Sequence, residues 1–262
     1  MGTILKVARF ELQNLLCKKL FWIITSVYAM FTLAICLLSD LRQSYFSAVE
    51  SVPIMLLDFI APVFLVAILI STLSPVFVGD KENNTNQIPA TCLTGKKGRS
   101  IAKMLAAILL SVLACILIAI ITFAIPFLCN LFNGNLEVQY IGAELELSPI
   151  WSTGQHFGFS VVCLIVACVV LTTFLLFISV NTKTVIAAVS ISSILVLFEL
   201  LFNCFSFPTI IQEYNIWVLF KPYYLFVLNI FNISPYMNLL LLSVAFSPLC
   251  IFAVWQIIKK GV

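Results

Sequence analysis

The chain has 262 residues, of which 62% are apolar and 10% are charged, and its formal net charge is +3. Soluble globular domains carry about 25% charged residues, so this composition excludes that class and predicts an all-α polytopic membrane protein. No basic surface interleaved with stacking aromatic residues is present, which argues against nucleic acid as a partner.

Six stretches reach the roughly 20 apolar residues that a transmembrane helix needs. They are residues 20–38, 54–79, 104–128, 157–180, 184–206 and 236–257. Because Lys and Arg in short loops are retained in the cytoplasm, we place the N-terminus inside, which leaves only Arg42 and Lys221 on the outer side. We expect one transmembrane domain over residues 1–262, in the cell membrane, with both termini cytoplasmic.

Residues 1–19 carry a helical apolar pattern ahead of the first span. Ile4, Ala8 and Leu12 recur at helical spacing, while Lys6 and Arg9 occupy other faces. This pattern predicts an amphipathic elbow helix on the inner membrane surface. The alternative is an ordinary start to the first span.

Residues 207–235, between the last two predicted spans, hold two apolar patches at 216–220 and 223–231. Each patch is too short to cross a bilayer, and Tyr and Trp side chains typical of the headgroup region flank them. We predict a pair of re-entrant helices on the extracellular side. The alternative is an outer loop that lies flat on the lipid.

Two acidic residues fall inside predicted spans, where ionised groups are costly and often functional. Glu199 is in the outer half of the fifth span. It is a candidate residue of a translocation path, or alternatively a structural hydrogen-bond partner of Asn203. Asp58 follows Pro53 near the outer end of the second span. It is a second path candidate, and the alternative is an interfacial position of little cost.

The residues that enzymes and metal sites need are sparse. None of the nine cysteines forms a C-x-x-C pair, and we interpret them as small packing residues. His156 is the only histidine, with no metal or catalytic motif around it, and TGKKGRS lacks the spacing of a P-loop. We therefore predict no enzyme activity, metal site or cofactor in this chain, and any nucleotide must bind to another polypeptide.

The longest hydrophilic stretch lies between the second and third spans, at residues 80–100, on the cytoplasmic side. From Phe77 to Lys103 the sequence resembles the signature of ABC-2-type transporter permeases. That signature runs aromatic, acidic-basic-acidic, Gly-Thr, an apolar patch, Pro-x-Ser-Arg, and a Lys that opens the third span. The residues in step with it are Phe77, Asp80, Lys81, Glu82, Thr85, Lys96 and Lys103. Asn84 replaces the glycine and Leu93 the proline.

The resemblance implies a homodimer that works with two copies of a separate ATP-binding cassette subunit, in which ATP and Mg are bound. Residues 85–93 would be the coupling helix, with Ile88, Cys92 and Leu93 docking on the ATPase. The implied ATPase-coupling residues are Asp80, Lys81, Glu82, Thr85, Ile88, Cys92, Leu93 and Lys96. The alternative is a solvated cytoplasmic loop.

The outer loops are too short to form a recognition domain, so we expect the cargo to enter from the membrane or from the inner surface. The chain contains 23 phenylalanines and few charges in its spans, which favours an apolar or amphipathic cargo. Small peptides are favoured, as in the permeases that export toxin-like peptides or confer antimicrobial-peptide immunity, and drugs or lipids are the other candidates. Two other functions stay open. One is an ATPase-independent channel or proton-coupled carrier that uses Glu199, and the other is a membrane scaffold or sensor that moves no cargo.

Overall fold

The computed structural model describes residues 2–40, 56–82, 95–133, 153–204, 220 and 235–260. Within these ranges all regular secondary structure is helical, which confirms the predicted all-α fold for the described chain. The elements are α1 (Gly2–Leu16), α2 (Lys19–Asp40), the π-helix η1 (Leu56–Ile60), α4 (Ala61–Leu73), α5 (Val78–Glu82), α6 (Gly95–Asn133), α7 (Thr153–Asn181), α8 (Val185–Cys204) and α12 (Pro235–Lys260).

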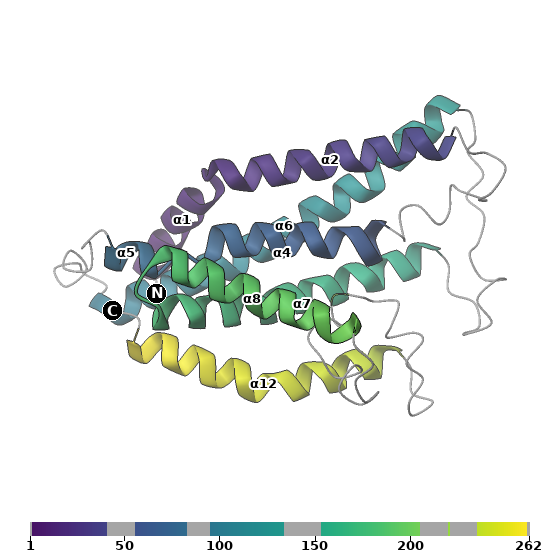
Figure 1. Ribbon diagram of the computed structural model, residues 1–262. Helices are drawn as coiled ribbons and strands as arrows, with labels where there is room; N and C mark the ends of the chain where they lie inside the picture. Colours follow the sequence, from purple (N-terminus) through teal and green to yellow (C-terminus); the bar gives the residue numbers. More distant parts are fainter. Residues whose placement is uncertain are drawn as a thin grey trace.

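The long helices run side by side along one bundle (Figure 1). Helix α6 packs against α1, α2, α4 and α7, and α7 packs in turn against α8 and α12. The chain begins and ends at the same end of this bundle, beside α5 (Figure 1). Both termini therefore lie on one side of the domain, as the sequence predicted; that this side is the cytoplasmic one stays a prediction.

Five helical segments of the described chain are long and apolar enough to cross a membrane. They are Lys19–Leu38, Leu56–Glu82, Lys97–Cys129, Phe157–Asn181 and Met237–Lys260, and each overlaps a predicted span. The predicted span at 184–206 falls on α8, whose side chains are described only for residues 185–197, too few to test a full crossing. The chain is a multi-pass helical membrane protein by these criteria, and a sixth crossing stays a prediction.

Helix α6 owes its central place to a face that repeats every three or four residues. Ala107, Leu110, Ala114 and Ile118 are all fully buried on that face, whereas Leu113 is 43% exposed. Alanine at two of these positions lets neighbouring backbones approach closely, which is how membrane helices associate where lipid gives no hydrophobic driving force. The buried hydroxyls of Tyr28 on α2 and Thr122 on α6 add a hydrogen bond of 2.5 Å across this packing.

The inner and outer helices differ in how much of their apolar surface the bundle covers. In Leu56–Glu82 and Phe157–Asn181, 61% of the most apolar stretch is buried, compared with 17% in Met237–Lys260. Helix α12 therefore presents large apolar side chains outward, including Ile251 and Trp255. Such a surface is compatible with contact to lipid.

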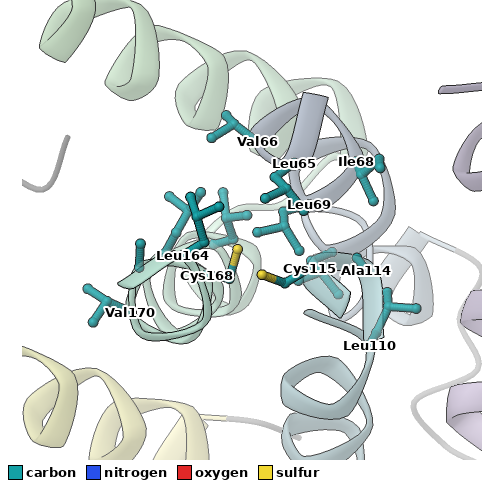
Figure 2. Close-up of a cluster of buried hydrophobic side chains, with 14 of the residues drawn as sticks. Leu65, Val66, Ile68, Leu69, Leu110, Ala114, Cys115, Leu164, Cys168 and Val170 are labelled. Carbon is teal, nitrogen blue, oxygen red and sulfur yellow. The ribbon is translucent and has the colours of Figure 1, made fainter. Parts of the chain in front are cut away.

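Two free thiols occupy the core between α4, α6 and α7. Figure 2 shows Cys115 of α6 and Cys168 of α7 pointing toward each other beneath Leu69. Cys36 and Cys163 are buried as well. The burial of these four cysteines agrees with their interpretation as packing residues, whereas Cys17 is exposed and does not fit it, and Cys92 lies outside the described residues.

The polar stretch at 80–100 is helical at both of its described ends. Helix α5 continues to Glu82, and α6 begins at Gly95 rather than at residue 104, where the apolar run alone predicted a span. Gly95 has a φ of 60°, a left-handed conformation that glycine adopts without strain. Residues 83–94, which include the whole predicted coupling helix at 85–93, lie outside the described residues.

Helix α1 is a separate helix before the first span. It ends at Leu16, and α2 starts at Lys19 after a short turn. Ala8 and Leu15 are buried, while Phe10 is 61% exposed on another face. The placement of α1 on the membrane surface stays a prediction, and the predicted re-entrant segment at 207–235 lies outside the described residues except for Phe220 and Pro235.

Candidate functional site

Three consecutive charges on α5, Asp80, Lys81 and Glu82, make contacts with three different helices. We call them the charged triplet. They are the acidic-basic-acidic part of the sequence signature, and they stand directly before the undescribed segment 83–94. Their contacts show how the start of that segment is fastened to the rest of the domain.

The first residue of the charged triplet is an anchor for helix α6. Asp80 Oδ2 lies 2.5 Å from Lys103 Nζ and 3.3 Å from an amino nitrogen of Arg99. The Lys103 side chain is only 4% exposed, and its Nζ also donates to the Val76 carbonyl at 2.9 Å. A buried ammonium group is tolerated when it is paired and hydrogen-bonded, so Asp80 is what allows this lysine to point inward. Arg99 also reaches Glu11 of α1 at 3.6 Å.

The other two residues of the charged triplet hold opposite ends of two successive helices. Lys81 Nζ donates to the Val180 carbonyl at 2.5 Å and to the Thr182 carbonyl at 3.4 Å, at the C-terminal end of α7. A Glu82 carboxylate oxygen accepts from the backbone N–H of Val185 at 3.0 Å, at the first residue of α8. A cation suits the negative end of one helix dipole, and an anion suits the positive end of the next.

The turn before α5 is attached to α7 in the same way. The backbone N–H groups of Phe77 and Val78 both donate to the Ser179 hydroxyl, at 3.0 and 3.4 Å. Lys103 Nζ lies 5.4 Å from the centre of the Phe77 ring, within the range of a cation–π contact. The aromatic residue of the signature therefore supports the same lysine that Asp80 neutralises.

This arrangement makes α5 a mechanical joint. It is bonded to α6 through Asp80, to α7 through Lys81 and to α8 through Glu82, and α6 is bonded onward to α1. A displacement of α5 cannot occur without breaking these bonds or moving the helix ends with it. The site can thus transmit movement, and among the described residues no group of three or more His, Cys, Asp and Glu side chains could hold a metal ion.

Only part of the predicted coupling set lies in the described chain. Asp80, Lys81 and Glu82 meet at this joint, whereas Thr85, Ile88, Cys92 and Leu93 lie outside the described residues. Lys96 belongs to the first turn of α6, but its side chain is not described.

Three residues that complete the joint were not among the predicted coupling residues: Glu11, Arg99 and Lys103, of which only Lys103 had been named in the signature. Arg99 and Lys103 stood within or beside the polar stretch, and their spacing of one helical turn was the signal that could have paired them with one acid. Nothing in the sequence linked Glu11 to Arg99, because that contact joins two separate helices.

The path candidate Asp58 lies in η1, far from the charged triplet along the second span. Its side chain is 1% exposed, so the interfacial position with little cost does not describe it. Ser160 of α7 donates to Oδ1 at 3.2 Å, and Oδ2 has no hydrogen-bond partner among the described residues. A π-helical turn and an incompletely bonded carboxyl group are both features that recur at functional sites, which keeps Asp58 a candidate.

The other path candidate, Glu199, belongs to α8, but its side chain is not described. Its predicted hydrogen bond to Asn203 therefore stays a prediction, as does a role in translocation. The structure does not bring the two path candidates into a common described site.

The Asp80–Lys103 pair makes a testable prediction about stability. Asp80→Ala leaves a buried ammonium without its carboxylate, and we expect a loss of about 3 kcal/mol, at the low end for a broken buried pair because Asp80 is 22% exposed. The measurement is the thermal unfolding of the purified chain in detergent. Glu82→Ala is the control, since that side chain is exposed, and it should lose about 1 kcal/mol or less.

Removing the unpaired charge of Lys103 as well should restore the thermal stability that Asp80→Ala loses. The double variant Asp80→Ala with Lys103→Met should regain most of the lost melting temperature. If Asp80→Ala alone melts like the unmodified chain, the pair does not stabilise the joint.

A second prediction concerns Asp58 and Ser160. Ser160→Ala removes the one described hydrogen bond to a buried carboxyl group, and we expect a loss of about 1–3 kcal/mol in the same unfolding measurement. In an Asp58→Leu background the same serine substitution should cost much less, because no carboxyl group remains to be satisfied. Equal losses in the two backgrounds would mean that Ser160 stabilises the helix packing independently of Asp58.

We compared the chain with known proteins. No protein-family model matches it, and no curated protein matches it.

Proposed function

We propose that this chain is the membrane-spanning subunit of an ATP-driven exporter of the ABC type. Two copies form the membrane pathway, and two copies of a separate ATP-binding cassette subunit bind ATP and Mg and supply the energy. The cargo is apolar or amphipathic, with small peptides favoured. Both termini and α5 face the cytoplasm of the cell in this proposal.

The observation that carries the proposal is the set of contacts made by the charged triplet. A subunit driven from outside needs a cytoplasmic segment that an ATPase can push and that moves several membrane helices at once. Asp80, Lys81 and Glu82 attach α5 to α6, α7 and α8, and segment 83–94 follows α5 directly. A solvated loop has no need for three charges that each hold a different helix.

The distribution of cations supports the proposed orientation. Lys81 lies on α5, Arg99 and Lys103 lie beside it on α6, and Lys260 at the end of α12 donates to Asn181 of α7 at 2.7 Å. The end of the bundle that holds α5 and both termini is therefore the lysine- and arginine-rich end. Membrane proteins retain such ends in the cytoplasm, where an ATPase subunit can reach them.

The proposed cargo follows from the character of the helix surfaces. The described spans expose large apolar side chains, and the acidic path candidates are few. A pathway built from these surfaces suits a cargo that partitions into the membrane rather than a small ion. Within this class of apolar or amphipathic cargo, the proposal favours small peptides.

The test is copurification with the ATPase subunit. Ile88→Asp together with Leu93→Asp should abolish copurification, because charged side chains cannot dock in an apolar groove, while the chain still inserts into the membrane. Ile88→Leu with Leu93→Ile is the matched control and should retain the partner. Full copurification of the aspartate variant would exclude this segment from the interface.

A transport assay then separates the pump from the carrier. Purified chain and ATPase reconstituted in vesicles should move a fluorescent amphipathic peptide only with ATP and Mg. Transport that proceeds without nucleotide and follows a proton gradient would instead support the carrier that uses Glu199 and would overturn the proposal.

A further inference from the structure

A pocket of about 200 Å³ opens beside the joint, between α1, the turn that leads into α2, the end of the second span and α6. The polar and glycine residues that line it are Glu11, Asn14, Lys18, Gly79, Asp80 and Lys103. Asp80, Lys103 and Glu11 already belong to the joint, whereas Asn14, Lys18 and Gly79 take no part in it. The pocket is therefore a feature that the transmission of movement does not explain.

The distinctive residue of this pocket is Lys18. Its Nζ donates to the Thr72 carbonyl at 2.7 Å, and in the part of the chain that the structure describes it forms no ion pair. Burial, and next the nearby charge of Lys103, lower the pKa of Lys18 to about 8. The pocket thus holds a partly desolvated cation whose charge no described carboxylate balances.

The charges around the pocket leave a place for one anion. Asp80 is already shared by Lys103 and Arg99, and Glu11 is bonded to Arg99. Three cations therefore face two carboxylates, and the one without a carboxylate is Lys18. A singly charged anion seated in the pocket would balance the group.

The position of the pocket along the first span points to the source of that anion. Lys18 directly precedes the apolar segment Lys19–Leu38. Four residues on, Trp22 is 52% exposed, and its indole nitrogen donates to the Leu16 carbonyl at 2.8 Å, while Ile23 beside it is 55% exposed. Exposed Trp and Lys at the start of a span mark the headgroup region, so the pocket opens at the depth of lipid phosphates.

We propose that this pocket binds the phosphate of an anionic phospholipid, with Lys18 as the cation that recognises it. A lipid with one phosphodiester charge and no headgroup amine supplies the single missing negative charge. A free phosphate ion shares this chemistry, and the experiment distinguishes the two sources. The inference does not rest on an ATPase partner.

The experiment is native mass spectrometry of the full chain released from detergent in the presence of dioleoyl phosphatidylglycerol or dioleoyl phosphatidylethanolamine. The unmodified chain should retain the phosphatidylglycerol preferentially. Lys18→Gln should weaken that binding about fivefold, the effect of one lysine near an anionic surface. Glutamine can still donate to the Thr72 carbonyl, so the fold should persist.

Lys19→Gln is the matched control, because it removes the same charge one residue away on an exposed side chain. It should change phosphatidylglycerol binding by about twofold or less. Equal weakening by the two variants would mean general attraction to basic residues and would overturn the proposal.

Inorganic phosphate provides the second arm. It should not raise the melting temperature of the lipid-free chain at concentrations of a few millimolar. If it does so in the unmodified chain and not in Lys18→Gln, the ligand is a soluble anion and the lipid assignment is wrong.

A pH series tests Lys18 without relying on its removal. The groups that face it are Glu11 and Asn14 from α1, Asp80 from α5 and Lys103 from α6. Because an anion favours the protonated amine, phosphatidylglycerol binding should be constant below about pH 8 and fall above it. Lys18→Arg should retain binding and lose this fall, since guanidinium stays charged. A pH profile that is the same in Lys18→Arg and the unmodified chain would contradict the assignment.

Discussion

The arrangement of the joint at α5 depends on one buried charge. Lys103 is almost fully enclosed at the start of the most extensively packed helix, α6, and an ammonium group in that position requires a carboxylate within contact distance. Asp80 meets that requirement, and it can do so only if α5 lies against α6. The placement of α5 then brings the next two charges, Lys81 and Glu82, to the ends of α7 and α8.

The order of charges in the triplet has a physical reason. Helix α7 ends and α8 begins within a few residues of each other, so carbonyl groups and N–H groups that lack helical partners lie side by side. A lysine followed by a glutamate satisfies both, and the reverse order would set like partial charges together. The same order that lets the chain resemble an ABC-2 signature is thus the order that these helix ends require.

Composition was enough to predict a helical multi-pass membrane protein, because apolar stretches of span length have few other uses. The predicted third span began only at residue 104, because Lys97, Arg99 and Lys103 interrupt the apolar run and the partners of Arg99 and Lys103 cannot be read from the sequence. Glu11 and Ser160 could not be selected from the sequence, since each acts through a contact with a residue far along the chain. Asp58 could be selected as a candidate because it is an acidic residue in an apolar run, but its burial could not be predicted from the sequence.

The central claim is that α5 couples the ends of α6, α7 and α8, and amide hydrogen exchange of the Lys81→Met variant tests it most directly. This substitution removes only the contact to the end of α7. The account predicts faster exchange together in residues 95–103 of α6, 176–181 of α7 and 185–189 of α8, because loosening one attachment of a shared joint weakens the others. Faster exchange confined to the end of α7 would contradict the account.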